Sequence, residues 1–279
     1  MLAVAVLEKL QLRQFHVKKA FLQDTLQEEV YMCQPEGFDN VSGWVCKLKQ
    51  APGCWNQRFV DFMKKERLKV SRVDSCIFVR QRNGKKLIVA IYVDDGMIAG
   101  SDESEIDVFT DQLRCNFKIM MGTLSNFLGI HTEQRHDGIF VFQRIYTEMV
   151  FDRVMMHAAN PAATPCDHSS GESEDSVGTH VPYREAVGYL MYLNEHIQTA
   201  FAMSRAARAM DRPTEANWTD VERILKYLWG TSNYGLLYGA GNSKWVFEAF
   251  SDFADDVRTR RSMSGVVAVY AGSATAWSS

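Results

Sequence analysis

Two adjacent acids, Asp94 and Asp95, stand inside an otherwise apolar stretch that reads IYVDDGMIAG over residues 91–100. β-Branched and aromatic residues on both sides of a short Asp-Gly break predict a β-hairpin, with both carboxylates at or beside its tip. An Asp before Gly often serves a turn and nothing else. The doubled acid on a buried hairpin needs a further explanation, so the pair is the first candidate for chemistry.

The elements around this pair predict an α+β fold. Strands are expected at 75–81 (SCIFVRQ) and 85–93 (KKLIVAIYV), because both are apolar runs joined by the tight-turn sequence RNG. Residues 55–69 repeat apolar side chains every three or four positions, which is typical of an amphipathic helix. Residues 104–117 begin with cap and acid signals and continue with helical spacing, so a second helix is expected to pack on the sheet.

The rest of the chain is expected to be mixed as well. Residues 2–13 have helical spacing and lead into a strand and helix start at 15–22. A strand and a helix are expected over 138–156, a linker rich in Pro, Ser, Gly and acids near 160–181, helices around 183–210 and 214–230, and short strands over 241–279.

Composition limits the class of protein. The chain has 279 residues, 46% of them hydrophobic, and a formal net charge of -3, so it can bury a sizeable core and needs local basic surface to bind a polyanion. The six cysteines include no C-x-x-C pair and are expected to be reduced thiols. Residues 1–7 resemble neither a signal peptide nor a membrane span. We therefore expect an intracellular protein of the cytoplasm or nucleus with no membrane partner.

Several segments, in order and nearly end to end, resemble the reverse transcriptase of copia-type (Ty1/copia) LTR retrotransposons. They are VKKAFLQDTLQEEVYMCQPEGF, KLKQAPGCWNQRF, IYVDDGMIAG, FLGIHTEQRHDGIFVFQRIY, VPYREAVGYLMYL, RILKYLWGTSNYGLLY and FSDFADDVRTRRSMSG. The Tyr-Val-Asp-Asp box is short and weak by itself, but the ordered set is highly specific. The resemblance identifies part of the Pol polyprotein of a transposable element.

What the resemblance implies is a right-hand polymerase. Its expected parts are partial fingers and palm over 1–115, a thumb-like region over 116–160, a linker over 161–181, a helical connection region over 182–240, and the truncated start of an RNase H-like domain over 241–279. The palm is expected to be an antiparallel sheet with packed helices. The implied partners are an RNA template, a DNA primer, their hybrid, and deoxynucleotides.

The same resemblance implies the chemistry of the acids. Nucleotidyl transfer in such polymerases uses two Mg²⁺ ions, which require hard oxygen ligands. By the match, Asp94 is the retained metal ligand, Asp95 is its neighbour, and His16 stands where the family has its first catalytic Asp. The positions expected to contact the nucleotide or template are Val17, Phe21, Gln50, Ala51 and Pro52.

The departures from the family predict an inactive copy. Neutral imidazole is a poor Mg²⁺ ligand and imidazolium would repel the ion, so His16 is either a substitution tolerated because nothing is catalysed, which we favour, or part of a His-based metal site. Gly53 replaces a usual Arg, and residues are missing before Lys49 and after LMYL. We expect a truncated, degenerate reverse transcriptase; the alternative is a non-catalytic nucleic-acid-binding relic of the scaffold.

Other polar residues have weaker interpretations. Asp252 matches the first RNase H acid, but with Asp255 and Asp256 it is expected to form only a solvated acidic turn. His131, His136, His157 and His168 are assigned no site. A basic cluster either coats a solvated helix face or contacts nucleic acid; its members are Lys47, Lys49, Arg58, Lys64, Lys65, Arg67, Arg80, Arg82, Lys85 and Lys86.

Overall fold

The computed structural model describes residues 1–22, 29–35, 37, 44–48, 52–154, 156, 160–167, 181–193, 199–239, 246–255 and 262–278. The chain forms two compact units. The N-terminal unit is Glu8–Leu124, and the C-terminal unit combines Met1–Leu7 with Ser125–Ser279. Each unit is described by itself below.

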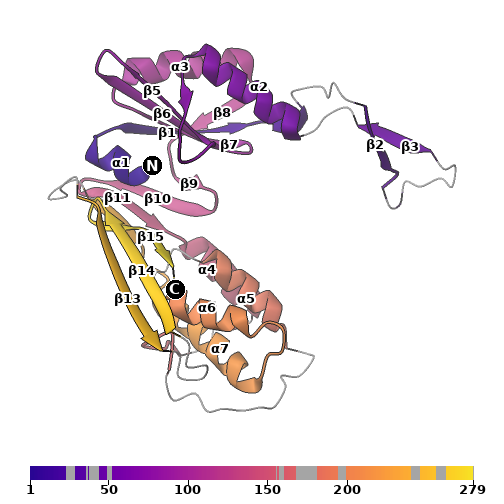
Figure 1. Ribbon diagram of the computed structural model, residues 1–279, viewed down its shortest axis with the longest axis vertical. Coiled ribbons are helices and arrows are strands. Elements are labelled where there is room, and N and C mark those ends of the chain that lie inside the picture. The colour runs from indigo at the N-terminus through magenta and orange to yellow at the C-terminus, as the bar shows by residue number, and fades with distance from the viewer. Residues whose placement is uncertain are drawn as a thin grey trace. The chain divides into compact units, whose positions relative to one another are not determined.

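The N-terminal unit contains a six-stranded antiparallel sheet in the order β4-β5-β6-β7-β1-β8. Figure 1 labels β1, β5, β6, β7 and β8 of this sheet. Its strands are β1 (Gln11–Val17), β4 (Lys69–Val70), β5 (Ile77–Arg82), β6 (Lys85–Tyr92), β7 (Asp95–Gly100) and β8 (Ile119–Gly122). The expected hairpin and the two strands before it are confirmed. Because β8 pairs with β1, the compact unit includes residues up to Leu124.

Two helices, α2 (Pro52–Lys65) and α3 (Glu103–Asn116), cover this sheet (Figure 1). The expected helix at 104–117 is confirmed: the Asp102 carboxylate accepts from the Glu105 N–H as its N-cap. Ion pairing with Lys85, aided by hydrogen bonds from Ser104 and the Glu105 N–H, lowers the pKa of Asp102 to about 2. The core between sheet and helices combines aliphatic side chains with aromatic rings, which include Phe15, Trp55, Phe59, Phe62, Phe78, Phe109 and Phe117.

The remaining elements of this unit are short. The chain turns through η1 (Ala20–Leu22) after β1, and β2 (Val30–Cys33) pairs with β3 (Val45–Leu48) as a separate two-stranded sheet. The expected helix over residues 2–13 is mostly wrong. Helix α1 spans only Leu2–Leu7, and the chain is already in β1 from Gln11, because Leu12, Phe15 and Val17 are needed in the core of the sheet.

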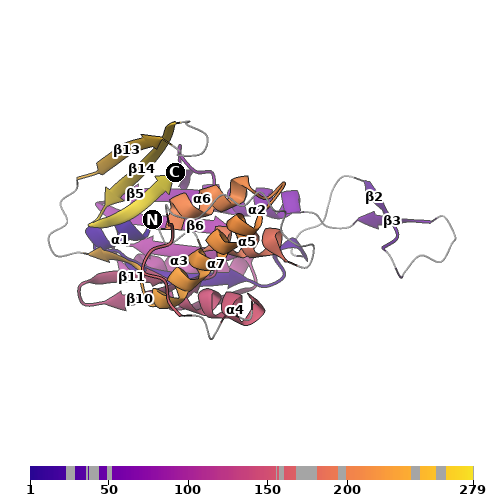
Figure 2. The same cartoon turned by 90° about the horizontal axis from the view of Figure 1, so that it is seen from below.

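The C-terminal unit contains a four-stranded sheet in the order β12-β11-β10-β9. Its described part also contains helices α4 to α7, which Figure 2 labels together with β10 and β11. The strands are β9 (Asn126–Phe127), β10 (Ile130–Arg135), β11 (Gly138–Phe142) and β12 (Leu236–Gly239), and α1 packs on β11 and β12. The helices are α4 (Arg144–Val154), α5 (Tyr183–Tyr192), α6 (Ala200–Arg208) and α7 (Glu215–Gly230). The expected strand and helix over 138–156 and the helix ending at Gly230 are confirmed.

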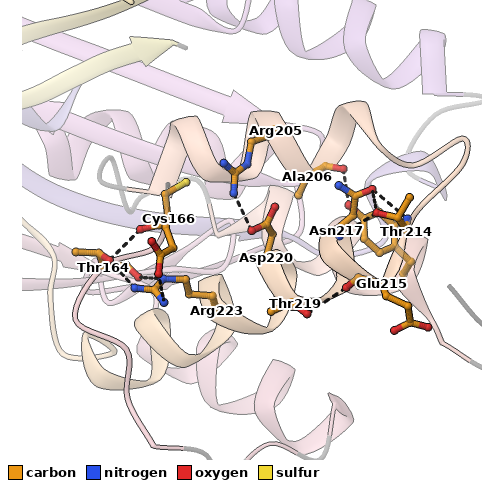
Figure 3. A network of polar contacts seen from close by, with 12 residues as sticks. Thr164, Cys166, Arg205, Ala206, Thr214, Glu215, Asn217, Thr219, Asp220 and Arg223 are labelled. Carbon is orange, nitrogen blue, oxygen red and sulfur yellow. Dashed lines mark hydrogen bonds and ion pairs between the residues drawn. The ribbon is translucent and has the colours of Figure 1, made fainter. Parts of the chain in front are cut away.

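The single helix expected around 183–210 is wrong, because α5 ends at Tyr192 and α6 begins at Ala200. The two helices pack against each other and against α7, which one continuous helix cannot do. Polar contacts hold this bundle together: Arg205 pairs with the buried Asp220 at 2.8 Å, and Thr214 and Asn217 form a capping box (Figure 3).

Residues Thr164 and Asp167, in the expected linker, make polar contacts with α7. Arg223 donates to the Thr164 carbonyl and hydroxyl at 3.1 and 2.9 Å and pairs with Asp167 at 3.3 Å (Figure 3). Burial raises the pKa of the nearby Cys166 thiol. Residues 168–180 lie outside the described part of the chain. The expected regional boundaries, the linker included, stay predictions.

The tail forms a three-stranded antiparallel sheet of β13 (Glu248–Asp255), β14 (Ser262–Tyr270) and β15 (Ser273–Ser278). Strand β15 packs against β12 and α6, and the Tyr238 hydroxyl of β12 donates to the Ala274 carbonyl at 3.0 Å. The short strands expected over 241–279 are therefore present, and they are attached to the rest of the C-terminal unit.

The cysteines and the helices complete the description of the fold. All six cysteines are free thiols. Among the described residues, no helix combines the length and apolarity needed to cross a membrane.

Candidate functional site

Strand β1 lies beside β7 and sets which residue faces the two acids. Its antiparallel register pairs His16 with Asp95 and Phe15 with Gly96. The Val17 N–H continues the pattern and donates to the Asp94 carbonyl at 2.7 Å. The backbone thus brings His16 to the tip of the β6–β7 hairpin, as the resemblance implied.

The tip of the hairpin is a two-residue turn made by Val93 and Asp94, since Tyr92 and Asp95 are a paired position of the ladder. Val93 has φ +58°, an uncommon value for a β-branched residue. The Trp55 indole N–H donates to the Val93 carbonyl at 2.7 Å. Trp55 therefore stabilises a turn that the local sequence disfavours, a role that its position on an apolar helix face did not reveal.

Gly96 belongs to β7 and not to the turn, contrary to the expected Asp-Gly break. Its φ is not in the left-handed region, so the turn does not require a glycine there. The requirement comes from β1, because the buried Phe15 ring covers the position where a side chain would begin: a Cβ at Gly96 would lie 2.0 Å from Phe15 Cζ. The glycine beside the acids is thus explained by packing.

Three side chains meet at this tip. His16 Nδ1 lies 3.0 Å from Asp95 Oδ1, and His16 Nε2 lies 3.9 Å from Asp94 Oδ2. Because an ionised carboxylate only accepts, the close contact places a hydrogen on Nδ1 and leaves Nε2 with a lone pair when the ring is neutral. The side chains are 39%, 40% and 32% exposed for His16, Asp94 and Asp95, so an ion can reach them from solvent.

These residues do not fit a pair of Mg²⁺ ions. Among the described residues this is the one cluster of three or more His, Cys, Asp or Glu side chains close enough to share an ion, with ligand atoms within 4.8 Å of one another. It contains two carboxylates, and one of them is bound to His16. Mg²⁺ takes oxygen ligands in octahedral geometry, so two carboxylates and one imidazole offer too few oxygen ligands for two Mg²⁺ ions.

The other positions expected to contact the nucleotide or template lie in different environments. Val17 is fully buried, and its N–H is used by the hairpin, so its contribution is to hold the turn. Phe21 is 40% exposed. Pro52 begins α2, which suits a residue without an N–H. Gln50 and Ala51 lie outside the described residues.

A cavity of about 290 Å³ lies beside the turn. Its lining includes Phe21, Trp55, Phe78, Tyr92 and Val93, but neither acid. The structure therefore brings Phe21 to the Tyr92–Val93 side of the hairpin. The cavity is mainly apolar and offers no second group of carboxylates.

Half of the residues in the expected basic cluster form ion pairs with acids of the same chain. Its ion pairs are Lys47–Glu29, Lys64–Asp61, Arg80–Glu105, Lys85–Asp102 and Lys86–Glu8. Among the described members, Lys65, Arg67 and Arg82 are exposed and have no ion pair with a described acid. Lys49 is outside the described residues, and Arg58 stacks on Phe117 at 5.2 Å.

The remaining sequence candidates lie elsewhere. Asp252 is exposed on β13, Asp255 ends that strand, and Asp256 is outside the described residues. His131 lies on β10, and His136 is exposed in the turn between β10 and β11. Neither belongs to a cluster of described residues that could share an ion, and His157 and His168 are outside the described residues.

Comparison with known proteins agrees with the sequence resemblance. Residues 1–168 match the family described as Reverse transcriptase (RNA-dependent DNA polymerase). The chain is 33% identical to the retrovirus-related Pol polyprotein from transposon TNT 1-94 of Nicotiana tabacum and 34% identical to that from transposon RE2 of Arabidopsis thaliana. Both alignments cover 100% of this chain but 23% and 20% of those relatives, so the chain spans about a fifth of their length.

A shorter relative is matched over nearly its whole length. The putative transposon Ty5-1 protein of Saccharomyces cerevisiae is 25% identical over 94% of this chain and 91% of its own length. The β1 register, the Asp94–Asp95 hairpin and these matches lead to one conclusion: the chain belongs to the reverse transcriptase (RNA-dependent DNA polymerase) family and corresponds to that region of a Ty1/copia retrotransposon Pol polyprotein.

Proposed function

We propose that this chain is an RNA-directed DNA polymerase by descent that does not extend primers with Mg²⁺. The observation that carries the proposal is His16, which lies 3.0 Å from Asp95 at the position where the family has a carboxylate. In relatives, two Mg²⁺ ions stabilise the attacking and leaving oxygens. Here the strand beside the acids supplies an imidazole, so the stabilisation from a shared oxygen ligand is lost.

The size of this loss supports inactivity. Charge stabilisation by a metal ion is worth several kcal/mol, and each 1.36 kcal/mol changes a rate about tenfold. Loss of the ligand therefore reduces the rate by roughly a hundredfold or more. The residues missing before Lys49 remove further support for template and nucleotide, so His16→Asp alone is expected to leave the chain inactive.

Primer extension on a primed RNA template tests this proposal directly. The unmodified chain, His16→Asp and Asp94→Asn are each incubated with Mg²⁺ and all four deoxynucleotides, beside an active copia-type reverse transcriptase as the positive control. We expect extension only in the positive control. Incorporation by the unmodified chain that Asp94→Asn abolishes would refute the proposal, and recovery in His16→Asp would show that His16 is the single defect.

A second candidate is a non-catalytic scaffold that binds nucleic acid. It is favoured by exposed cations beside the hairpin, where Lys18 and Lys19 directly follow β1 and Lys118 precedes β8. The Lys18 N–H donates to the Lys118 carbonyl at 2.8 Å, so two of these cations come from adjacent segments. Phosphate binding by such side chains is sequence-independent and weakens with salt.

Fluorescence anisotropy with a labelled RNA–DNA hybrid separates the two candidates. Binding that falls steeply with salt, and falls again in Lys18→Gln/Lys19→Gln, supports the scaffold. Arg212→Gln/Lys226→Gln in the C-terminal unit is the charge-matched control, because it removes two cations that lie far from the hairpin in the sequence. Equal effects of the two double variants would show only nonspecific charge attraction.

We also propose that the strands β13 to β15 descend from the start of an RNase H-like domain. Asp252 on β13 supports this assignment because it stands at the position of that family's first acid. Glu248 and Asp255 stand at the two ends of the same strand. Among the described residues, Asp252 belongs to no cluster that could share an ion. We therefore expect no cleavage of the RNA strand in an RNA–DNA hybrid, and cleavage abolished by Asp252→Asn would refute this.

A further inference from the structure

We propose that His16, Asp94 and Asp95 form a binding site for one divalent transition-metal ion, Zn²⁺ in preference to Mg²⁺. The inference concerns the same hairpin as the proposed function, but it rests on donor geometry and not on polymerase activity. A chain that binds Zn²⁺ and no nucleic acid would refute the scaffold candidate alone.

The hydrogen bond between His16 and Asp95 prepares the imidazole for an ion. Metal-binding histidines commonly donate their second ring N–H to a carboxylate, which fixes the tautomer and increases the basicity of the ligand nitrogen. Asp95 Oδ1 accepts at 3.0 Å from Nδ1 and leaves the Nε2 lone pair on the side of Asp94. In this assignment Asp95 is the positioning residue, and His16 and Asp94 are the ligands.

The distance between the two ligand atoms suits a tetrahedral ion. Two ligands at about 2.0–2.1 Å from tetrahedral Zn²⁺ are roughly 3.4 Å apart, whereas neighbouring ligands of octahedral Mg²⁺ are about 3.0 Å apart. His16 Nε2 and Asp94 Oδ2 are 3.9 Å apart. A shift of roughly 0.5 Å by the Asp94 carboxylate gives the zinc geometry, and water fills the remaining positions.

The donor types select the same ion. Imidazole suits Zn²⁺, Cu²⁺, Ni²⁺ and Fe²⁺, while Mg²⁺ and Ca²⁺ take oxygen ligands. A carboxylate at position 16 would favour Mg²⁺, so the change to histidine alters which ion the hairpin binds rather than simply removing a ligand. Binding needs little ordering, because the β1–β7 register and the Trp55 bond to the Val93 carbonyl already hold these backbones.

Metal titration of the full chain tests the site. Calorimetry with Zn²⁺ and with Mg²⁺ is combined with NMR of the histidine rings, in which the His16 signal is identified by its absence in His16→Asp. We expect a Zn²⁺ site at least tenfold tighter than any Mg²⁺ binding and an early shift of the His16 signal. Asp95→Asn should weaken Zn²⁺ binding roughly tenfold, the size of effect typical of residues that orient a ligand.

Matched variants separate this site from any Zn²⁺ bound by the six free cysteines, since thiolates are Zn²⁺ ligands. His16→Asp should lose the Zn²⁺ site and bind Mg²⁺ more tightly, whereas His136→Asp, the same change in an exposed turn, should change neither. His16→Gln should lose Zn²⁺ without adding charge, and thermal melts should show that each variant folds. Equal Zn²⁺ binding by His16→Asp and the unmodified chain would overturn the proposal, as would Mg²⁺ bound as tightly as Zn²⁺.

Discussion

Gly96→Ala tests whether the hairpin depends on packing of β1 rather than on the turn. The added Cβ would lie 2.0 Å from Phe15 Cζ and 2.3 and 2.4 Å from its Cε atoms, while ordinary contact begins near 3.4 Å. The ring must therefore move by more than 1 Å. Phe15 is fully buried and stacks on Phe59 with ring centroids 6.5 Å apart, so moving the ring disturbs the core around it.

The cost of this substitution should be about 3 kcal/mol of unfolding free energy. Overpacking a well-filled core costs about 1–3 kcal/mol, and a whole ring displaced toward a second ring belongs at the upper end. For a unit of this size that corresponds to a fall in Tm of roughly 10 °C. Urea unfolding followed by circular dichroism measures it, and amide exchange in β1 and β7 assigns the loss to the N-terminal unit.

A control and a double variant make the test specific. Gly122→Ala adds a methyl group to β8 of the same sheet, where nothing lies within 4 Å, and should change stability by less than about 1 kcal/mol. In a Phe15→Leu background, Gly96→Ala should lose most of its cost, giving a coupling energy of roughly 1.5 kcal/mol. Equal costs for the two glycines, or no coupling with Phe15, would refute the packing explanation.

Three further substitutions test the contacts that support each unit. Trp55→Phe should cost about 2 kcal/mol, because the Val93 carbonyl loses its donor, and should broaden hairpin signals in NMR spectra; unchanged spectra would contradict the role of the indole N–H. Burial raises the pKa of Tyr183 to about 12, above its ordinary 10. The stabilisation from its neutral hydroxyl is therefore complete below pH 10 and declines as pH rises toward 12. Tyr183→Phe should cost about 1 kcal/mol at pH 7, because the hydrogen bond to the Ala206 carbonyl is lost, and should remove that decline in pH-dependent melts. Asp220→Ala should cost about 2 kcal/mol, which is less than the roughly 3–5 kcal/mol for a fully buried pair because Arg205 is 21% exposed. An unchanged free energy of unfolding in a urea titration would show that the ion pair does not stabilise the bundle.

The elements that sequence alone predicted well are those with strong local signals. The paired strands before Asp94, the hairpin, and the Asp102-capped helix α3 depend on alternation, turn residues and caps that lie close together in the chain. The single helix expected around 183–210 failed for the opposite reason. Its division into α5 and α6 follows from packing against α7, which is a long-range contact.

For the candidate site, sequence determined the residue types and the tertiary structure decided their roles. Sequence alone allowed a direct comparison with the family for the two acids, the preceding apolar strand and His16. The contact of His16 Nδ1 with Asp95, the Trp55 bond to Val93, and the ring of Phe15 over Gly96 could not, because each joins segments separated by about 40 to 80 positions. Such contacts depend on strand register and helix placement, which the whole packed unit determines.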